Sequence, residues 1–78
     1  MVNIDEKTKQ TAISLARTEI KKHKTNYLDY RLADIRPIKG QPDKYFVRFE
    51  LPDTEDAKIE MIIDIKSAQI SEYKDQWS

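Results

Sequence analysis

The spacing of apolar side chains changes once along this chain, and that change limits the folds open to it. Apolar residues recur at helical intervals over residues 5–23 and at intervals of two from Leu28 onward. A period of 3.6 is typical of an amphipathic helix, and a period of two is typical of a half-buried strand. The alternation is clearest over residues 45–51 and 59–65. The sequence therefore predicts one helix followed by an antiparallel β-meander.

The helix is predicted from about residue 5 to residue 24. Asn3 or Asp5 is a candidate N-cap, and the last turn, from Lys21 to Lys24, is cationic, which suits the negative end of the helix dipole. The apolar stripe consists of Ala12, Ile13, Ala16 and Ile20, with Leu15 at its border. Such a stripe needs another element to cover it.

Four strands are predicted, at about residues 28–36, 44–51, 58–65 and 70–74. In the first, the parity of the apolar positions changes near Ala33, which indicates a β-bulge. Pro37 cannot donate a ladder hydrogen bond, so this strand is predicted to lie at a sheet edge or to end there. Gly40 to Asp43 is a predicted turn, and Pro52 to Asp56 is a predicted polar loop.

The fold class that follows is α+β. Because neither element can bury its apolar face alone, one N-terminal helix is expected to pack on a three- to four-stranded antiparallel β-meander. Residues 1–78 are too few for two cores and form a single domain. Phe46 and Ile62 have the opposite parity to the inward-facing residues. Those inward-facing residues are Tyr45, Val47, Phe49, Leu51, Ile59, Met61, Ile63 and Ile65.

Composition narrows the function classes. The 78 residues contain no cysteine, which excludes disulfides and thiolate zinc sites. No stretch approaches the roughly 20 apolar residues of a membrane span, so no membrane insertion is expected. The first five residues lead into no apolar run of a signal peptide. A complete chain would therefore be cytoplasmic, whereas a domain cut from a longer chain would leave the compartment open.

No catalytic or metal-binding constellation is recognisable. His23, the sole histidine, lies in a run of lysines at the predicted helix end, where a catalytic triad is not expected. Asp53, Glu55 and Asp56 crowd one loop, but they lack the alternating acidic ladder and the glycine of a calcium loop. We predict that the chain is not an enzyme, with no catalytic residue, metal or cofactor.

Four residues are candidates for a partner-binding surface: Phe46, Ile62, Tyr73 and Trp77. If Phe46 and Ile62 pair across a hairpin, they form an apolar spot on the sheet face away from the helix, a feature that often marks a binding site. The alternative is that the C-terminal tail, with Trp77, or a second copy of the chain covers that spot. A sheet edge is a further candidate for strand addition. The leading hypothesis is a protein- or peptide-binding module, with a homodimer as one form.

A basic helix face supports a second hypothesis. Lys9, Arg17, Lys21 and Lys24 belong to its cationic side chains, and clustered cations bind phosphate. Residues 1–48 carry eleven Lys and Arg against six Asp and Glu, whereas residues 49–78 carry three against eight. The net charge of the whole chain is zero and no nucleic-acid motif is present, so a nucleic-acid partner is the weaker hypothesis. A structural domain of a larger chain is the third.

The string from Ile62 to Ile70, IIDIKSAQI, resembles the closing hairpin of PepSY domains, and the order of helix and strands is similar to that family and, more loosely, to cystatin-like folds. In PepSY domains a strand runs into an Asp, here Asp64, and then into a turn that usually holds a glycine. Ala68 occupies the glycine position, where a positive φ would carry a steric cost. The resemblance implies a small, non-enzymatic, often extracytoplasmic bacterial module linked to peptidase regulation. It gives Asp64 a structural role in the turn.

Overall fold

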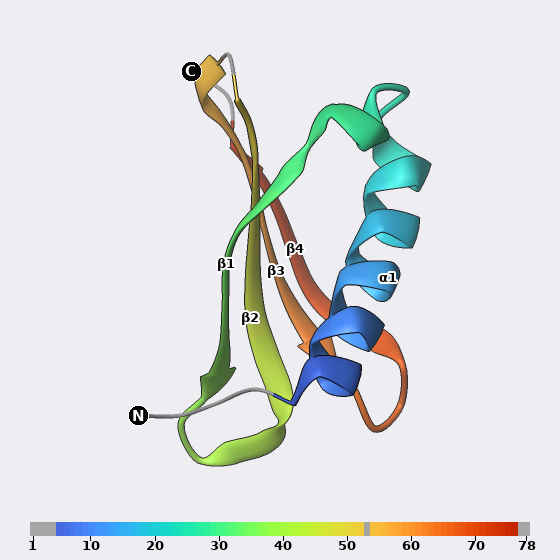
Figure 1. Ribbon diagram of the computed structural model, residues 1–78, viewed down its shortest axis with the longest axis vertical. Helices are drawn as coiled ribbons and strands as arrows, with labels where there is room; N and C mark the ends of the chain where they lie inside the picture. The colour runs from blue at the N-terminus through green and yellow to red at the C-terminus, as the bar shows by residue number, and fades with distance from the viewer. Residues whose placement is uncertain (1–4, 53, 77–78) are drawn as a thin grey trace.

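The computed structural model describes residues 5–52 and 54–76 of the chain. One helix covers one face of a single four-stranded antiparallel sheet with the strand order β1-β2-β3-β4, so the α+β prediction is confirmed (Figure 1). The elements are the α-helix α1 (Glu6–His23), the 3₁₀ turn η1 (Tyr27–Asp29), and the strands β1 (Arg31–Ile38), β2 (Gln41–Leu51), β3 (Thr54–Asp64) and β4 (Gln69–Gln76).

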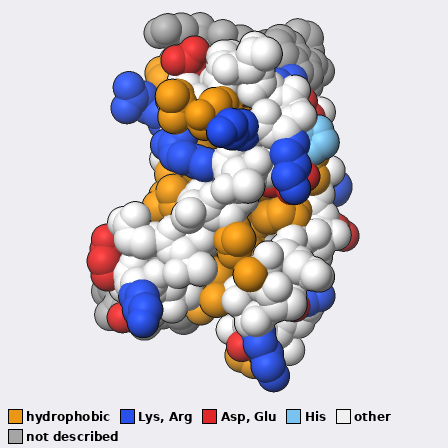
Figure 2. Space-filling model, turned by 90° about the vertical axis from the view of Figure 1, so that its right-hand side faces the viewer, with side chains coloured by type: hydrophobic (Ala, Val, Ile, Leu, Met, Phe, Trp, Pro, Cys, Tyr) orange, Lys and Arg blue, Asp and Glu red, His pale blue; other side chains and the backbone are white. Residues whose placement is uncertain are grey.

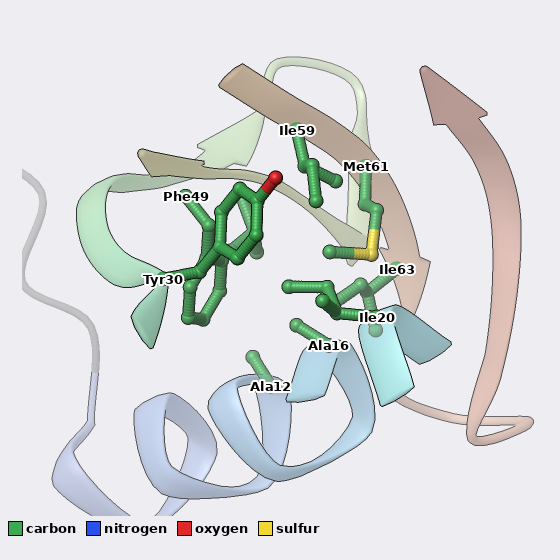
Figure 3. Close-up of a cluster of buried hydrophobic side chains, with 9 residues drawn as sticks. Ala12, Ala16, Ile20, Tyr30, Phe49, Ile59, Met61 and Ile63 are labelled. Carbon is green, nitrogen blue, oxygen red and sulfur yellow. The ribbon is translucent and has the colours of Figure 1, made fainter. Parts of the chain in front are cut away.

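The helix packs on the sheet through small side chains. Ala12, Ala16 and Ile20 are fully buried, and Ala12 and Ala16 bring the helix backbone close to the sheet. Figure 3 shows these residues facing the sheet side chains. The helix ends where the amide of Lys24 donates to the carbonyl of Ile20 at 2.8 Å. The predicted stripe and the helix bounds agree with the structure to within one residue at each end.

The core lies between α1 and the two central strands, as the alternation predicts. Its sheet side is formed by Tyr30, Val47, Phe49, Ile59, Met61 and Ile63, each no more than 1% exposed. Tyr45, Leu51 and Ile65 are only partly buried, since they lie near the strand ends. Each fully buried apolar side chain of this size contributes about 1.5–3 kcal/mol.

The first strand starts later than predicted. Tyr27–Asp29 forms the 3₁₀ turn η1, and the strand begins at Arg31, not at residue 28. Leu28 is 69% exposed, although the alternation placed it inward. The chain must cross here from the helix end to the sheet, and a local hydrogen bond from the amide of Asp29 to the carbonyl of Asn26 closes the turn. The need to connect the helix end to the sheet therefore outweighs the local alternation of apolar residues.

The irregularities predicted for the first strand are present. The ladder between β1 and β2 shifts register between Leu32 and Asp34, which leaves Ala33 as the extra residue of the bulge. Leu32 and Ile35 therefore both pack against the core. β1 is an edge strand of the sheet, and it contains Pro37.

Strands β2 and β3 begin earlier than predicted, at Gln41 and Thr54 rather than at residues 44 and 58. In both, a register shift follows the first pair, and the regular ladders cover residues 44–50 and 58–64. The turn at the β1–β2 connection is limited to Lys39 and Gly40, whose φ of 82° suits glycine. Strand β4 is longer than the predicted residues 70–74.

The turn between β3 and β4 has the local structure expected of Asp64. Its Oδ1 atom accepts hydrogen bonds from the amides of Lys66 at 3.0 Å and Ser67 at 3.2 Å. Ala68 has a φ of 56°, a left-handed conformation that favours glycine. The turn therefore carries a steric cost at Ala68, and the two hydrogen bonds to Asp64 offset part of it.

Candidate functional site

The far face of the sheet brings Phe46 and Ile62 together. They are direct cross-strand partners on β2 and β3, as expected if they pair across the hairpin. Both are half-buried, and the guanidinium of Arg36 lies 5.2 Å from the centre of the Phe46 ring. Among the described residues, Leu28 is the one large hydrophobic side chain that is exposed. The Phe46–Ile62 pair is therefore a small, partly covered apolar spot.

Charged residues of alternating sign surround this spot. One cross-strand row of the far face runs through Asp34, Arg48, Glu60 and Lys74, one residue from each strand in order. The neighbouring row runs through Arg36, Phe46, Ile62 and Glu72. A hollow of about 310 Å³ lies on this face, with Lys44, Ile62 and Glu72 in its lining. Opposite charges side by side make the face self-neutralising.

Tyr73 lies on the helix side of the sheet and is not part of the far-face spot. It pairs with the core residue Met61, and its ring stacks on His23 with the centroids 4.2 Å apart. Strict alternation from Ile70 would place Tyr73 on the far face. A register shift at Ser71 puts Ile70 and Tyr73 on the same side. Trp77, the fourth candidate, lies outside the described residues.

The environment of Tyr73 disfavours its ionised form. The hydroxyl is buried and makes no hydrogen bond to the described residues. Burial raises the pKa of Tyr73 to about 12, and the negative charge of Asp75 adds to the increase. Burial also raises the pKa of Tyr30, against the opposing charge of Lys24. Tyr73 is thus a packing residue.

The C-terminal half of β4 is fixed to the end of the helix. The ammonium of Lys24 lies 2.6 Å from the Asp75 carboxylate, and the two side chains are 16% and 25% exposed. His23, next to Lys24, stacks on Tyr73 and contacts Glu19 Oε2 at 3.0 Å through Nε2. These contacts hold β4 at a defined distance from α1.

A groove separates α1 from β4 further along the strand. It is open, with a volume of about 520 Å³, and its lining includes Leu15 and Glu19 from the helix and Ile70, Ser71 and Tyr73 from β4. Leu15, Ile70 and Tyr73 pack only partly against the core. Figure 2 shows hydrophobic side chains in a hollow between two more polar lobes of this side of the molecule.

The β4 edge beside this groove is unpaired within the described chain, because β4 is the last strand of the sheet. An edge strand presents free backbone N–H and C=O groups to another strand. The opposite edge, β1, carries the bulge at Ala33 and Pro37, which both hinder strand addition. The two edges are therefore not equivalent. The amino-acid pattern does not predict the groove, because the groove depends on how α1 sits over the sheet.

The basic helix face is partly committed to the fold. Arg17 donates to the carbonyl of Tyr30 at 3.1 Å and to that of Tyr27 at 3.5 Å, and it lies over the Phe49 ring at 5.3 Å. Lys24 is paired with Asp75. Lys21 lies over the Tyr27 ring, 5.6 Å from its centre, and Lys9 is partly buried. A phosphate-binding face would compete with these contacts.

Within residues 5–52 and 54–76, no group of three His, Cys, Asp or Glu side chains is arranged to hold a metal ion. The loop acids weighed for calcium include Asp53, which lies outside these residues. In the same part of the chain, no helix has the length and apolar character needed to cross a membrane.

Comparison of the chain with protein-family models found no match, and comparisons with curated proteins and with solved structures also found none. The PepSY resemblance therefore stays a prediction.

Proposed function

We propose that this chain is a non-enzymatic module that binds an extended polypeptide segment by strand addition at the β4 edge. The observation that carries the proposal is the unpaired edge of β4 beside the groove with α1. In strand addition, backbone hydrogen bonds supply affinity and side-chain pockets supply specificity. Here β4 offers the backbone groups, and the groove offers the half-buried Leu15, Ile70 and Tyr73.

The far sheet face supports binding less well. Its apolar spot is limited to Phe46 and Ile62, and Arg36 lies against the Phe46 ring. Around it, Arg36 pairs with Asp34 and Arg48 pairs with Glu50, so an outside partner would displace existing ion pairs. Binding energy is usually concentrated in well-packed apolar pockets, and the groove beside β4 is the larger of the two hollows, with Leu15, Ile70 and Tyr73 in its lining. The PepSY resemblance agrees with a binding role and suggests peptidase regulation as its setting.

The test uses peptides selected from a random display library and mapped on the chain by NMR. We expect selected peptides to shift the backbone amides of residues 72–75 in β4 and to protect those that point away from β3. Leu15→Lys places a charge in the groove and should weaken binding at least tenfold. Leu28→Lys, the same change at an exposed leucine outside the groove, should leave it unchanged. Shifts confined to β1 or to the far face, or equal effects of both variants, would contradict the proposal.

A further inference from the structure

We infer that the segment added to β4 is the β4 strand of a second copy of this chain, in a two-fold dimer centred on Tyr73. The inference rests on the proposed strand addition and names its partner. The dimer would join two four-stranded sheets edge to edge into one continuous sheet. An interface of this kind is isologous, so the same patch must be complementary to itself. The charges of β4 meet this condition in one register.

The geometry of antiparallel pairing limits the possible registers. Directly opposed residues share a sheet face, and a two-fold axis makes one residue of each strand its own partner. Glu72 and Lys74 share the far face, and Tyr73 lies between them on the helix side. These three residues lie beyond the Ser71 register shift, in the regular part of β4. The axis can pass at Glu72, at Tyr73 or at Lys74 with pairing on both sides of it, whereas an axis at Asp75 would place two carboxylates opposite each other.

Charge selects one of the three registers. An axis at Glu72 places two carboxylates opposite each other, and an axis at Lys74 places two ammonium groups opposite each other. An axis at Tyr73 places Glu72 opposite Lys74 of the partner subunit, and Lys74 opposite Glu72 of the partner subunit. Opposite charges in direct cross-strand positions stabilise pairing, whereas like charges destabilise it. Both β4 side chains are exposed and available for this pairing.

The same register continues the charge order of the far face across the interface. Within one chain, the row Asp34, Arg48, Glu60, Lys74 alternates in sign and ends on a positive charge at β4. Glu72 of the partner subunit would come next. The neighbouring row ends on Glu72, and Lys74 of the partner subunit would follow it. The alternation that surrounds the apolar spot in one chain therefore has a matching continuation in the second.

The helix side is compatible with the same arrangement. Tyr73 would face Tyr73 of the partner subunit, and aromatic cross-strand pairs are favourable. Stacking on His23 already fixes the Tyr73 ring. The groove beside β4 provides space between the two helices, since a two-fold axis perpendicular to the sheet places both on the same face. The register shift at Ser71 interrupts the ladder, so the interface is short and its affinity should be modest and sensitive to salt.

Sedimentation equilibrium of the full chain at low salt tests the inference with charge exchanges. Glu72→Lys and Lys74→Glu each create like-charge pairs and should weaken dimerisation at least tenfold. An equimolar mixture of the two variants should form a heterodimer, because every cross-strand pair is then opposite in sign. The double exchange Glu72→Lys with Lys74→Glu should restore the homodimer. Lys39→Glu, an exposed charge reversal in the β1–β2 turn, is the matched control and should dimerise like the natural chain.

Several outcomes would overturn the inference. They are a natural chain that stays monomeric up to roughly millimolar concentration, single variants that dimerise normally, and a mixture that does not associate. Circular dichroism confirms that each variant is folded. The library experiment separates the two proposals. If selected peptides bind at β4 while the chain is monomeric, strand addition stands and the partner is another polypeptide. If the chain is monomeric and peptides still avoid β4, the proposed function itself fails.

Discussion

The imidazole of His23 stacks on the phenol ring of Tyr73, with an angle of 19° between the ring planes. This contact connects the last turn of α1 to the middle of β4, and the Lys24–Asp75 ion pair adds a second connection nearby. Because both contacts lie in the C-terminal half of β4, the N-terminal part of the strand is free to diverge from the helix. The groove lined by Leu15 and Ile70 lies there.

The loss of stability on truncating an apolar side chain is expected to depend on the sheet face that carries the side chain. Ile63→Ala removes a fully buried side chain and should lower the free energy of unfolding by about 2–5 kcal/mol. Ile62→Ala, the matched change one residue earlier, removes a half-buried far-face side chain and should cost clearly less. Urea denaturation followed by circular dichroism measures both. Equal costs would contradict the assignment of the two faces.

Ala68→Gly is expected to stabilise the chain by up to about 1 kcal/mol, because glycine adopts the φ of 56° without the steric cost that alanine has there. Ser67→Gly is the matched control, since Ser67 has no positive φ, and it should be neutral or destabilising. Thermal denaturation of the three proteins measures the difference. A loss of stability in Ala68→Gly would mean that this turn does not require a left-handed residue.

Tyr73 should make stability fall at alkaline pH. Its pKa is about 12 in the folded chain and about 10 in the unfolded chain, so the unfolded state loses the proton first. The contribution of Tyr73 to the free energy of unfolding is therefore complete below pH 10 and is lost as the pH rises toward 12. Tyr73→Phe keeps the ring and removes the titrating hydroxyl. The urea midpoint of Tyr73→Phe should fall less than that of the natural chain between pH 9 and 11. An equal fall of the two midpoints with pH would contradict the assignment of this effect to Tyr73.

At neutral pH, Tyr73→Phe should be neutral or slightly stabilising, because the buried hydroxyl makes no hydrogen bond to the described residues. Tyr73→Leu, which also removes the aromatic ring against His23, should be less stable than Tyr73→Phe. Thermal denaturation at pH 7 compares the two variants. A large loss in Tyr73→Phe would show that the hydroxyl has a polar partner.

Arg17 is expected to act in folding. Arg17→Met keeps the alkyl chain but removes the donor to the carbonyls of Tyr27 and Tyr30, and should cost about 1.5–3 kcal/mol. Lys21→Met, the matched loss of charge at an exposed position over the Tyr27 ring, should cost less than 1 kcal/mol. Denaturation midpoints measure both. If Arg17→Met leaves stability unchanged, the side chain is free for another role.

Local patterns predicted much of the fold because they depend on near neighbours. The parity of Val47 and Ile63 and the bulge at Ala33 follow from side-chain spacing alone, and the turn role of Asp64 was implied by the PepSY resemblance. Where a register shift interrupts a strand, the alternation no longer predicts which sheet face a side chain lies on. The extra residue Ser71 turns Tyr73 to the helix side, although strict alternation from Ile70 would place it on the far face.

The amino-acid pattern was enough to predict the order of the elements, the faces of the two central strands and the absence of cysteine chemistry, because period and composition act locally. Three features emerged from the three-dimensional packing instead: the exposure of Leu28, the contacts of Arg17 with backbone carbonyls and of Lys24 with Asp75, and the groove beside β4. These features depend on where the helix axis lies over the sheet. That placement results from the small Ala12 and Ala16 contacts and the His23–Tyr73 stack acting together, and no single segment of the chain encodes it.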